Sequence, residues 1–151
     1  MSSQHKDFEA SKCTNGDSTT LTNSNLCHTV VNGDSAPWLL LKFQNQVAVT
    51  RVDIYNRAKY GSRTRNLEVR LTEEEPTTAD TMYTRGQLLG TFEGPGAKGQ
   101  IISVGGPAKT GRYVLIQMNH QDVLHFHEVS VFGRVSSGLP KMISDARWTI
   151  D

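Results

Sequence analysis

The chain contains 151 residues, about the size of one domain, and its 16 Lys and Arg residues nearly balance its 15 Asp and Glu residues. The net charge of +1 argues against nucleic-acid and membrane-surface binding, because both rest on an excess of cations. No apolar run approaches the roughly 20 residues that a membrane-spanning helix needs. The polar start of the chain, residues 1–7, predicts no signal peptide, which fits a cytosolic protein or a mature or trimmed form.

Short runs of β-branched and aromatic residues alternate along the chain with segments rich in Gly, Asn, Asp and Pro. No stretch has the apolar spacing of an amphipathic helix. The runs predict strands at 38–43, 47–55, 67–72, 88–92, 101–104, 113–118 and 123–132. Seven or eight such strands with polar turns between them predict an all-β fold, either a sandwich or a jelly roll.

Three of these runs also predict how their strands are buried. Strict alternation of apolar and polar residues over Leu67–Leu71 predicts a strand with one buried face. The apolar phase slips between Val49 and Val52, which predicts a β-bulge or a crossing between sheets. The run Tyr113–Met118 is nearly continuous, as expected of a central strand that is covered on both faces.

Two segments fall outside the strand pattern. Residues 10–37 are dense in Ser, Thr, Asn, Asp and Gly, and a polar stretch of this length in a compact domain is usually functional or stabilised by a metal. Residues 136–151 follow the last predicted strand. We therefore expect one domain over residues 1–135 and a C-terminal tail over residues 136–151.

Three stretches of the chain have the order and spacing of a known family. They are Cys27–Thr29 followed by Pro37-Trp38, then Val49–Arg57, and finally Gly111–Met118 followed by Glu128–Gly133. In these stretches the chain resembles the F-type lectins, the fucose-binding family of eel agglutinin within the discoidin-like galactose-binding superfamily. The resemblance spans residues 10–134 and implies a discoidin-like jelly-roll β-sandwich of about eight antiparallel strands.

The family binds its sugar with a histidine and two basic residues on loops at one end of the sandwich. The resemblance assigns the first two positions to His28 and Arg57. The third position, seven residues after Arg57, holds Thr64, so that Arg63 and Arg65 on either side are both candidates. Guanidinium groups are strong donors to sugar oxygens, and a neutral imidazole accepts a hydroxyl proton.

The same loop departs from the family in its charge. Lys59 stands where the family has Asp, and Tyr60 replaces an adjacent pair of cysteines, offering an aromatic face to the sugar ring. Four cations fall in the nine residues from Arg57 to Arg65. Without the resemblance, they would be interpreted as a solvated loop and His28 as a structural residue. Clustered cations nevertheless repel one another unless an anionic or polar ligand compensates them.

No catalytic motif is present to suggest an enzyme. The sequence has no Gly-x-Ser-x-Gly, no His-Glu-x-x-His and no phosphate-binding loop. A glycosidase needs two carboxylates that flank its sugar, and the loops around His28 and Arg57 supply only Asp34. We therefore expect a binding protein.

The resemblance also implies a structural calcium ion, held by oxygen ligands in the N-terminal loop and by a glutamate from the last strand. The matching positions are Asn15, Asp17 and Glu128, and oxygen ligands are those that calcium prefers. An ion would also explain how the polar segment becomes ordered. Taken alone, Asn15-Gly16-Asp17 reads equally well as an ordinary turn.

The two cysteines, Cys13 and Cys27, allow one disulfide at most. In the family, the cysteine beside the sugar-binding histidine bonds a cysteine just before the calcium glutamate, a position that His127 occupies here. Cys27 is therefore expected to pair with Cys13, closing a loop of about 15 residues worth about 3 kcal/mol. Two free thiols in a reducing compartment are the alternative.

The resemblance implies an extracellular lectin whose partners are fucosylated or galactosylated glycans. Because single sugar sites are weak, a homo-oligomer is expected as well. Lys59 and Thr64 favour an alternative, a discoidin-like adhesion module that binds a protein, an acidic glycan or a lipid headgroup. A third hypothesis is a structural module of a larger assembly, with residues 136–151 making contacts.

Overall fold

The computed structural model describes residues 1–22, 24–31, 34–75, 84, 86–135 and 141–142. In these ranges the chain forms strands β1 (Cys27–His28), β2 (Trp38–Asn56), β3 (Leu67–Thr72), β4 (Gln87–Phe92), β5 (Ile101–Met118), β6 (His125–Val135) and β7 (Lys141–Met142). Two single-turn 3-10 helices, η1 (Ala10–Cys13) and η2 (Gly61–Arg63), are the only helical elements among these described residues. The predicted all-β class is confirmed.

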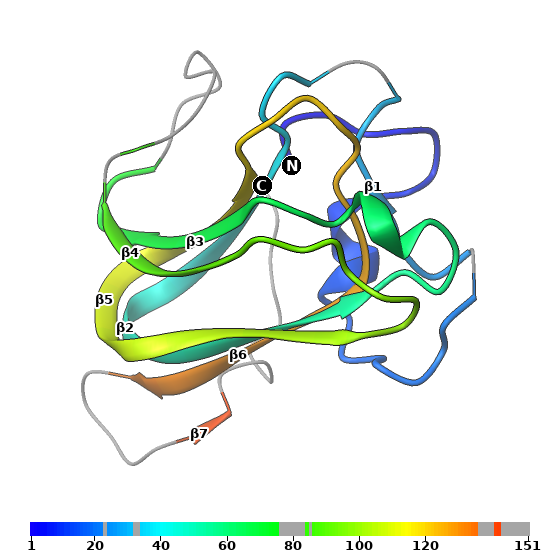
Figure 1. Ribbon diagram of the computed structural model, residues 1–151. Helices are drawn as coiled ribbons and strands as arrows, with labels where there is room; N and C mark the ends of the chain where they lie inside the picture. Colours follow the sequence, from blue (N-terminus) through cyan, green and yellow to red (C-terminus); the bar gives the residue numbers. More distant parts are fainter. Residues whose placement is uncertain (23, 32–33, 76–83, 85, 136–140, 143–151) are drawn as a thin grey trace.

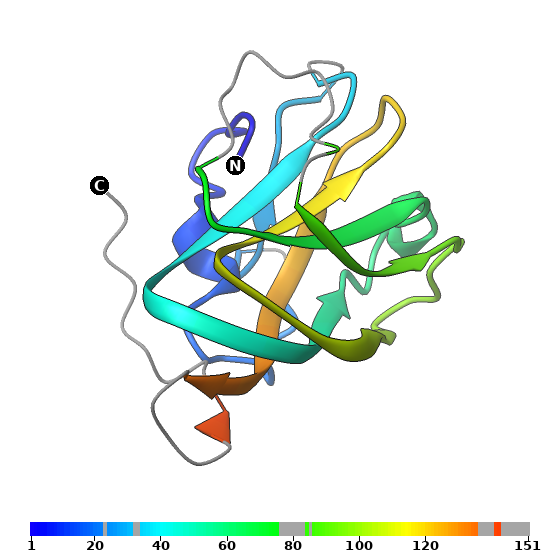
Figure 2. The same cartoon turned by 90° about the vertical axis from the view of Figure 1, so that its left-hand side faces the viewer.

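The two long strands, β2 and β5, each take part in both layers of the sandwich (Figures 1 and 2). The first part of β2 pairs with the second part of β5, and β3 and β4 continue that layer. The second part of β2 pairs with the first part of β5 and with β6, which also carries β1 and β7. The antiparallel order β1-β6-β2-β5-β3-β4 is that of the predicted jelly-roll sandwich.

Because β2 and β5 cross between the layers, each of them joins two of the predicted strands. The register of β2 against β5 shifts between Lys42 and Val47 and again between Val49 and Arg51. The second shift, which also occurs against β6, falls where the apolar phase slips in the sequence. The predicted bulge is therefore confirmed, whereas the predicted strand ends at residues 43 and 104 were wrong. A bulge interrupts the hydrogen-bond ladder and the apolar pattern only locally, so the strand continues beyond it.

The core lies between the two layers and matches the burial predicted from the pattern. In β3, the side chains of Leu67, Val69 and Leu71 are fully buried, while the residues between them are half-buried. The second part of β5, Tyr113–Met118, is buried at every position and is a central strand between β2 and β3. Both burial predictions are confirmed.

The N-terminal segment, β1 and the turn η2 lie at one end of the sandwich, on the right in Figure 1. Of the predicted tail, residues 136–140 and 143–151 lie outside the described residues, whereas Lys141–Met142 pair with Phe132 and Gly133 of β6. The domain boundary after residue 135 stays a prediction.

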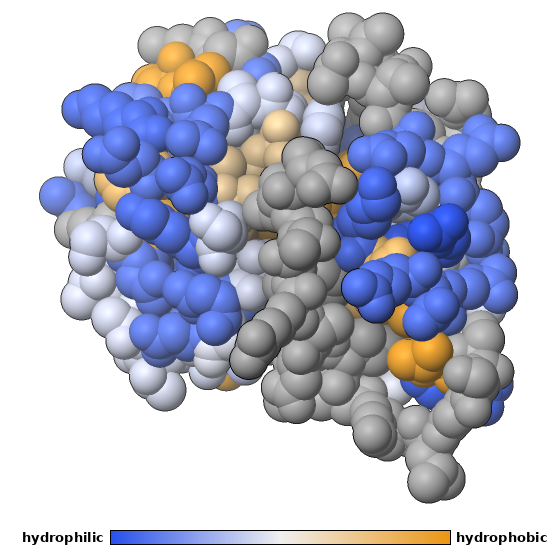
Figure 3. All heavy atoms as spheres, turned by 180° about the vertical axis from the view of Figure 1, so that it is seen from behind, coloured by the Kyte–Doolittle hydropathy of each residue, from blue (hydrophilic) through white to orange (hydrophobic). Residues whose placement is uncertain are grey.

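Seen from behind, the described surface is mainly hydrophilic, with apolar areas that are small and separated (Figure 3). No helix within the described ranges is both long and apolar enough to cross a membrane.

Candidate functional site

His28 is held between two neighbouring segments at the end of the sandwich. On one side β1 pairs with β6, which places His28 opposite His125. On the other side the N-terminal segment runs along β1, with His5 N–H donating to the His28 carbonyl at 2.9 Å and His28 N–H donating to the Phe8 carbonyl at 3.1 Å. The ring of His28 lies 5.2 Å from that of His5, 5.8 Å from Phe8 and 5.5 Å from His125, centroid to centroid.

The imidazole of His28 can accept a hydrogen bond at Nε2. Its Nδ1 is hydrogen-bonded to the Thr29 carbonyl, which only accepts, so the ring hydrogen belongs on Nδ1 and the lone pair on Nε2. Burial lowers the pKa of His28 below its ordinary value, and the positive charges of Arg57 and Arg63 lower it further. At neutral pH the ring is therefore uncharged, and its Nε2 can take a hydroxyl proton in a hydrogen bond.

The residues that follow β2 form a second loop at this end, which we call the cation loop (residues 57–64). Its shape depends on the fully buried side chain of Asn56. The Asn56 amide donates to the Gly61 carbonyl at 3.0 Å and to the Ala97 carbonyl at 2.8 Å. Its oxygen accepts from Arg57 N–H at 2.9 Å and from the Thr64 hydroxyl at 2.8 Å. One side chain thus fixes both ends of the loop.

The cation loop also packs closely against the turn at residues 93–100. A Cβ on Gly61 would lie 2.9 Å from both the Ala97 carbonyl oxygen and the Asn56 amide nitrogen, and one on Gly96 would lie 2.5 Å from that nitrogen. Gly96 N–H in turn donates to the Thr64 carbonyl at 2.8 Å. Only glycine leaves room for this packing.

Tyr60 stands out of the cation loop and is surrounded by positive charge. Its backbone is in the left-handed region at φ 64°, an uncommon and costly conformation for a tyrosine, and its side chain remains 49% exposed. The guanidinium carbons of Arg57 and Arg63 lie 5.4 and 4.9 Å from the ring centroid, and the Lys59 ammonium lies 5.1 Å from it. Contacts of this kind attract a cation to the ring face without neutralising it.

His125, on β6, lies beneath this positive charge. Its side chain is fully buried, and neither ring nitrogen makes a hydrogen bond within normal geometry, although the backbone of Tyr60 is close. Burial is the main cause that lowers the pKa of His125 to about 3, and the charges of Arg57 and Arg63 act in the same direction. The buried imidazole of His125 is therefore uncharged at neutral pH.

Four of the five expected sugar-binding residues come together in this arrangement: His28, Arg57, Tyr60 and Arg63. Arg65 does not join them, because its Nε donates to His120 Nε2 at 3.3 Å and its Nη2 lies 3.7 Å from the Asp122 carboxylate. The turn η2 ends at Arg63, and the chain beyond it leads toward the loop between β5 and β6. The geometry therefore separates the two arginines that the spacing left open.

Sequence reasoning missed three residues of this site, two beside His28 and one that holds the cation loop. His5 and Phe8 reach it from a distant part of the chain, and their polar surroundings carry no strand pattern that would have placed them there. The role of Asn56 depends on loops that meet only in the fold. A polar residue at the end of an apolar run was the one available signal for Asn56.

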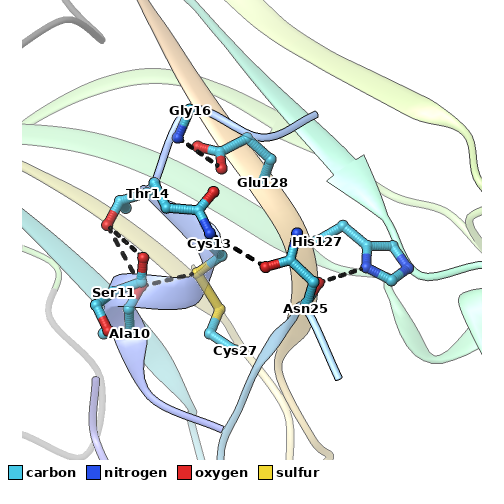
Figure 4. The surroundings of a disulfide bond; sticks show 10 residues. Ala10, Ser11, Cys13, Thr14, Gly16, Asn25, Cys27, His127 and Glu128 are labelled. Atoms are coloured by element: carbon cyan, nitrogen blue, oxygen red, sulfur yellow. Dashed lines mark hydrogen bonds between the residues drawn. A yellow bond between two sulfur atoms is a disulfide. The ribbon is translucent and has the colours of Figure 1, made fainter. Parts of the chain in front are cut away.

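A disulfide joins Cys13 in η1 to Cys27 in β1, with the two Cα atoms 5.3 Å apart (Figure 4). This is the pairing expected from the sequence, and the described residues contain no free thiol. The bond ties the polar N-terminal segment to the strand that carries His28. His127 occupies the neighbouring space, where its Nδ1 is 2.8 Å from the Asn25 carbonyl oxygen.

Beyond the disulfide, a group of oxygen-bearing side chains comes together, which we call the oxygen cluster: Asn15, Asp17, Asn25 and Glu128. Gly16 N–H donates to the Glu128 carboxylate at 3.2 Å (Figure 4). The Asn25 amide donates to Asp17 Oδ2 at 3.3 Å, and the Asn15 amide donates to the Asn25 side-chain oxygen at 3.1 Å. All three residues of the expected calcium set therefore meet in one place.

The charges of the oxygen cluster suit a cation. Glu128 is 2% exposed, and burial raises its pKa to about 7, helped by the negative charge of Asp17. Asp17 stays ionised because hydrogen bonds from Thr20 and Thr19 lower its pKa to about 2. No ion pair to Glu128 forms within the described ranges, and no three His, Cys, Asp or Glu side chains gather there. Two carboxylates with amide oxygens are a donor set that fits calcium.

Comparison with known proteins supports the fold. No protein-family model and no curated protein matches the sequence. A fucolectin (F-lectin) from the serum of striped bass, Morone saxatilis, superposes with a TM-score of 0.74 at 20% identity, over 88% of this chain and 44% of that lectin. The lectin domain of lectinolysin, solved with Lewis B antigen, gives 0.67 at 23% identity, over 88% and 89% of the two chains.

A fucose-binding module of Streptococcus pneumoniae gives a TM-score of 0.66 at 19% identity, over 87% of both chains. The chain therefore has the fold predicted from its resemblance to the F-type lectins, and these structural neighbours are carbohydrate-binding modules. It spans less than half of the length of the striped bass lectin.

Proposed function

We propose that this protein is a lectin that binds fucose- or galactose-type sugars at the end of the sandwich formed by β1 and the cation loop. The observation that carries this proposal is the meeting of Arg57 and Arg63 around the exposed ring of Tyr60, with the buried, neutral His28 close enough for both charges to lower its pKa. Structural neighbours that bind fucose and Lewis B support the same reading.

Each residue has a separate role in this proposal. His28 accepts a sugar hydroxyl through Nε2, because its Nδ1 is already hydrogen-bonded. Arg57 and Arg63 donate to ring and hydroxyl oxygens, and charge-assisted bonds of this kind are stronger than neutral ones. Tyr60 packs on an apolar face of the sugar ring. His125 and Asn56 position these groups and do not touch the sugar.

The oxygen cluster supplies a second part of the proposal. Asp17, Glu128 and the side-chain oxygen of Asn15 would hold a structural calcium ion, which supplies positive charge to the buried Glu128. The disulfide beside it suits an extracellular setting, where such bonds persist. Display of several copies, as a homo-oligomer, would raise the avidity of single weak sites.

A glycan array tests the binding proposal, with four variants that differ in one side chain. We expect the wild type to bind fucosylated or galactosylated glycans, and His28→Ala, Arg57→Ala and Arg63→Ala to lose about 10- to 100-fold in affinity. Arg65→Ala is the matched control, because that side chain turns to Asp122. Equal losses in all four variants, or binding to protein or lipid without any glycan binding, would overturn the proposal.

A further inference from the structure

The cation loop carries more positive charge than a neutral sugar needs. Three cations lie within 5.4 Å of the Tyr60 ring centroid, on Arg57, Lys59 and Arg63. Arg57 and Arg63 already offer donors to sugar hydroxyls, and Lys59, which is exposed to solvent, adds a third cation over the same ring. Like charges held this close repel one another unless a ligand of opposite sign joins them.

Four cations outside the Tyr60 cluster are paired with carboxylates in the described ranges. Ion pairs join Lys42 to Glu75, Arg51 to Asp53, Arg65 to Asp122 and Arg70 to Glu68. Lys59 and Arg63 differ, because no carboxylate of the described ranges lies within ion-pair distance of either. The sequence explains the difference, since residues 54–67 contain no Asp or Glu.

The fold holds these charges together instead of letting them separate. Asn56 closes the loop from inside, and Arg63 N–H donates to the Tyr60 carbonyl at 3.1 Å. Arg57 and Arg63 are half-buried, so water screens their charges only in part, and both lower the pKa of the neighbouring His28. The positive field is therefore directed at the place where the sugar would bind.

We propose that the preferred ligand of this site is an anionic glycan, a fucose- or galactose-type sugar bearing a sulfate ester or a carboxylate that binds between Lys59 and Arg63. This inference rests on the proposed function and adds the substrate class. The sugar ring packs beside Tyr60, and the anionic group, attached to that ring or to the next one, reaches the cations of Lys59 and Arg63 that lie over the Tyr60 ring. Sulfate and carboxylate oxygens both accept strong hydrogen bonds from guanidinium and ammonium groups.

The test compares one fucosylated, galactose-containing trisaccharide in three forms: unsubstituted, O-sulfated and sialylated. Isothermal titration calorimetry is expected to give the sulfated or the sialylated form at least about tenfold higher affinity than the unsubstituted form at low salt. The two anionic arms distinguish a sulfate from a carboxylate site. The ratio should fall toward one as ionic strength rises from about 0.05 to about 0.5 M.

Two variants test whether Lys59 causes the preference for anionic trisaccharides. Lys59→Gln should reduce the ratio of anionic to unsubstituted affinity by about tenfold, whereas Lys109→Gln, on β5, makes the same change in net charge and should leave the ratio unchanged. Equal affinity for all three trisaccharides would overturn this inference and leave the lectin proposal standing. A preference that survives Lys59→Gln would overturn the assigned position.

Binding to none of the three trisaccharides would overturn the lectin proposal and this inference with it. Vesicles containing an anionic phospholipid serve as a further arm. Binding to them that is lost in Lys59→Gln, without binding to any trisaccharide, would assign the cations to a lipid headgroup and contradict the inference.

Discussion

The cation loop and the oxygen cluster lie at the same end of the sandwich, and both hold groups of like charge close together (Figure 1). Each gathers charges of one sign, and each is held by an asparagine whose amide bridges the loop: Asn56 in the first, Asn25 in the second. They differ in sign and burial. Lys59 is exposed and Arg63 is half-buried, whereas Glu128 is buried. An exposed positive loop suits a solute from outside, and a buried negative cluster suits a small ion that becomes part of the fold.

The largest expected effect comes from the asparagine of the cation loop. Asn56→Ala removes four hydrogen bonds and leaves buried carbonyl and hydroxyl groups without partners, which should cost about 3–4 kcal/mol of unfolding free energy. Urea unfolding measures the loss. Asn45→Ala, at an exposed position of β2, is the control and should change stability by less than about 0.5 kcal/mol. Similar values for both variants would show that Asn56 does not hold the loop.

The disulfide is the next largest contribution, and it lies between the N-terminal segment of the oxygen cluster and the strand that carries His28. The double variant Cys13→Ala/Cys27→Ala releases a bond between residues 14 positions apart, which should lower the unfolding free energy by about 3 kcal/mol. Because Cys27 precedes His28, glycan affinity should fall as well. Thermal unfolding with and without reductant measures the same effect in the wild type. An unchanged melting temperature in reductant would contradict the account.

Calcium should act on the oxygen cluster and not on the cation loop. At a concentration about 100 times the dissociation constant, calcium should stabilise the protein by about 2.7 kcal/mol, which a chelator removes. In chelator at about pH 8, Glu128→Gln should be at least as stable as the wild type, because it removes a buried charge whose pKa is raised to about 7. In calcium the order should reverse.

Two results would contradict calcium binding at the oxygen cluster. One is a melting temperature that is indifferent to calcium and chelator. The other is a Glu128→Gln variant that responds to calcium as strongly as the wild type. Lys59→Gln, at the other region, is the matched control and should respond to calcium as the wild type does.

The smallest expected effect is on acid stability. The pKa of His125 is about 3 in the folded protein, below the ordinary value of 6.5, so the unfolded chain binds more protons between these values. Stability is therefore complete above about pH 6.5 and decreases as the pH falls, by about 2 kcal/mol from about pH 7 to about pH 5. The lowered pKa of His28 acts in the same direction.

His125→Phe isolates this contribution. Urea unfolding at several pH values should show a pH dependence weaker by about one proton in the variant than in the wild type. Equal slopes for the two proteins would show that His125 does not lie neutral between His28 and the cations of Arg57 and Arg63.

Much of the fold was predictable because its strands carry their own burial pattern. The alternation in Leu67–Leu71 and the continuous run Tyr113–Met118 predicted both strands and their faces correctly. The bends of β2 and β5 were harder, because exposed residues at a crossing interrupt the apolar pattern without ending the strand. The strand β1 is two residues long and leaves no periodicity to detect.

Site residues were predictable only where they belong to a motif with a recognisable spacing. The resemblance proposed His28 and Arg57, and the structure brings both to one place. Spacing alone did not separate Arg63 from Arg65, since that choice depends on where the turn η2 ends and on the partner Asp122. Asn56 and His5 act through contacts between segments far apart in the chain, which no local pattern records.

The central claim is that one neutral histidine and two arginines bind the same sugar. Nitrogen-resolved NMR of the histidine and arginine side chains during a glycan titration tests it most directly. We predict that the His28 ring nitrogens and the Nε–H signals of Arg57 and Arg63 shift together with one dissociation constant, while His28 stays unprotonated and Arg65 is unaffected. A saturating glycan that leaves the His28 signals unmoved, or that moves Arg65 in place of Arg63, would contradict the account.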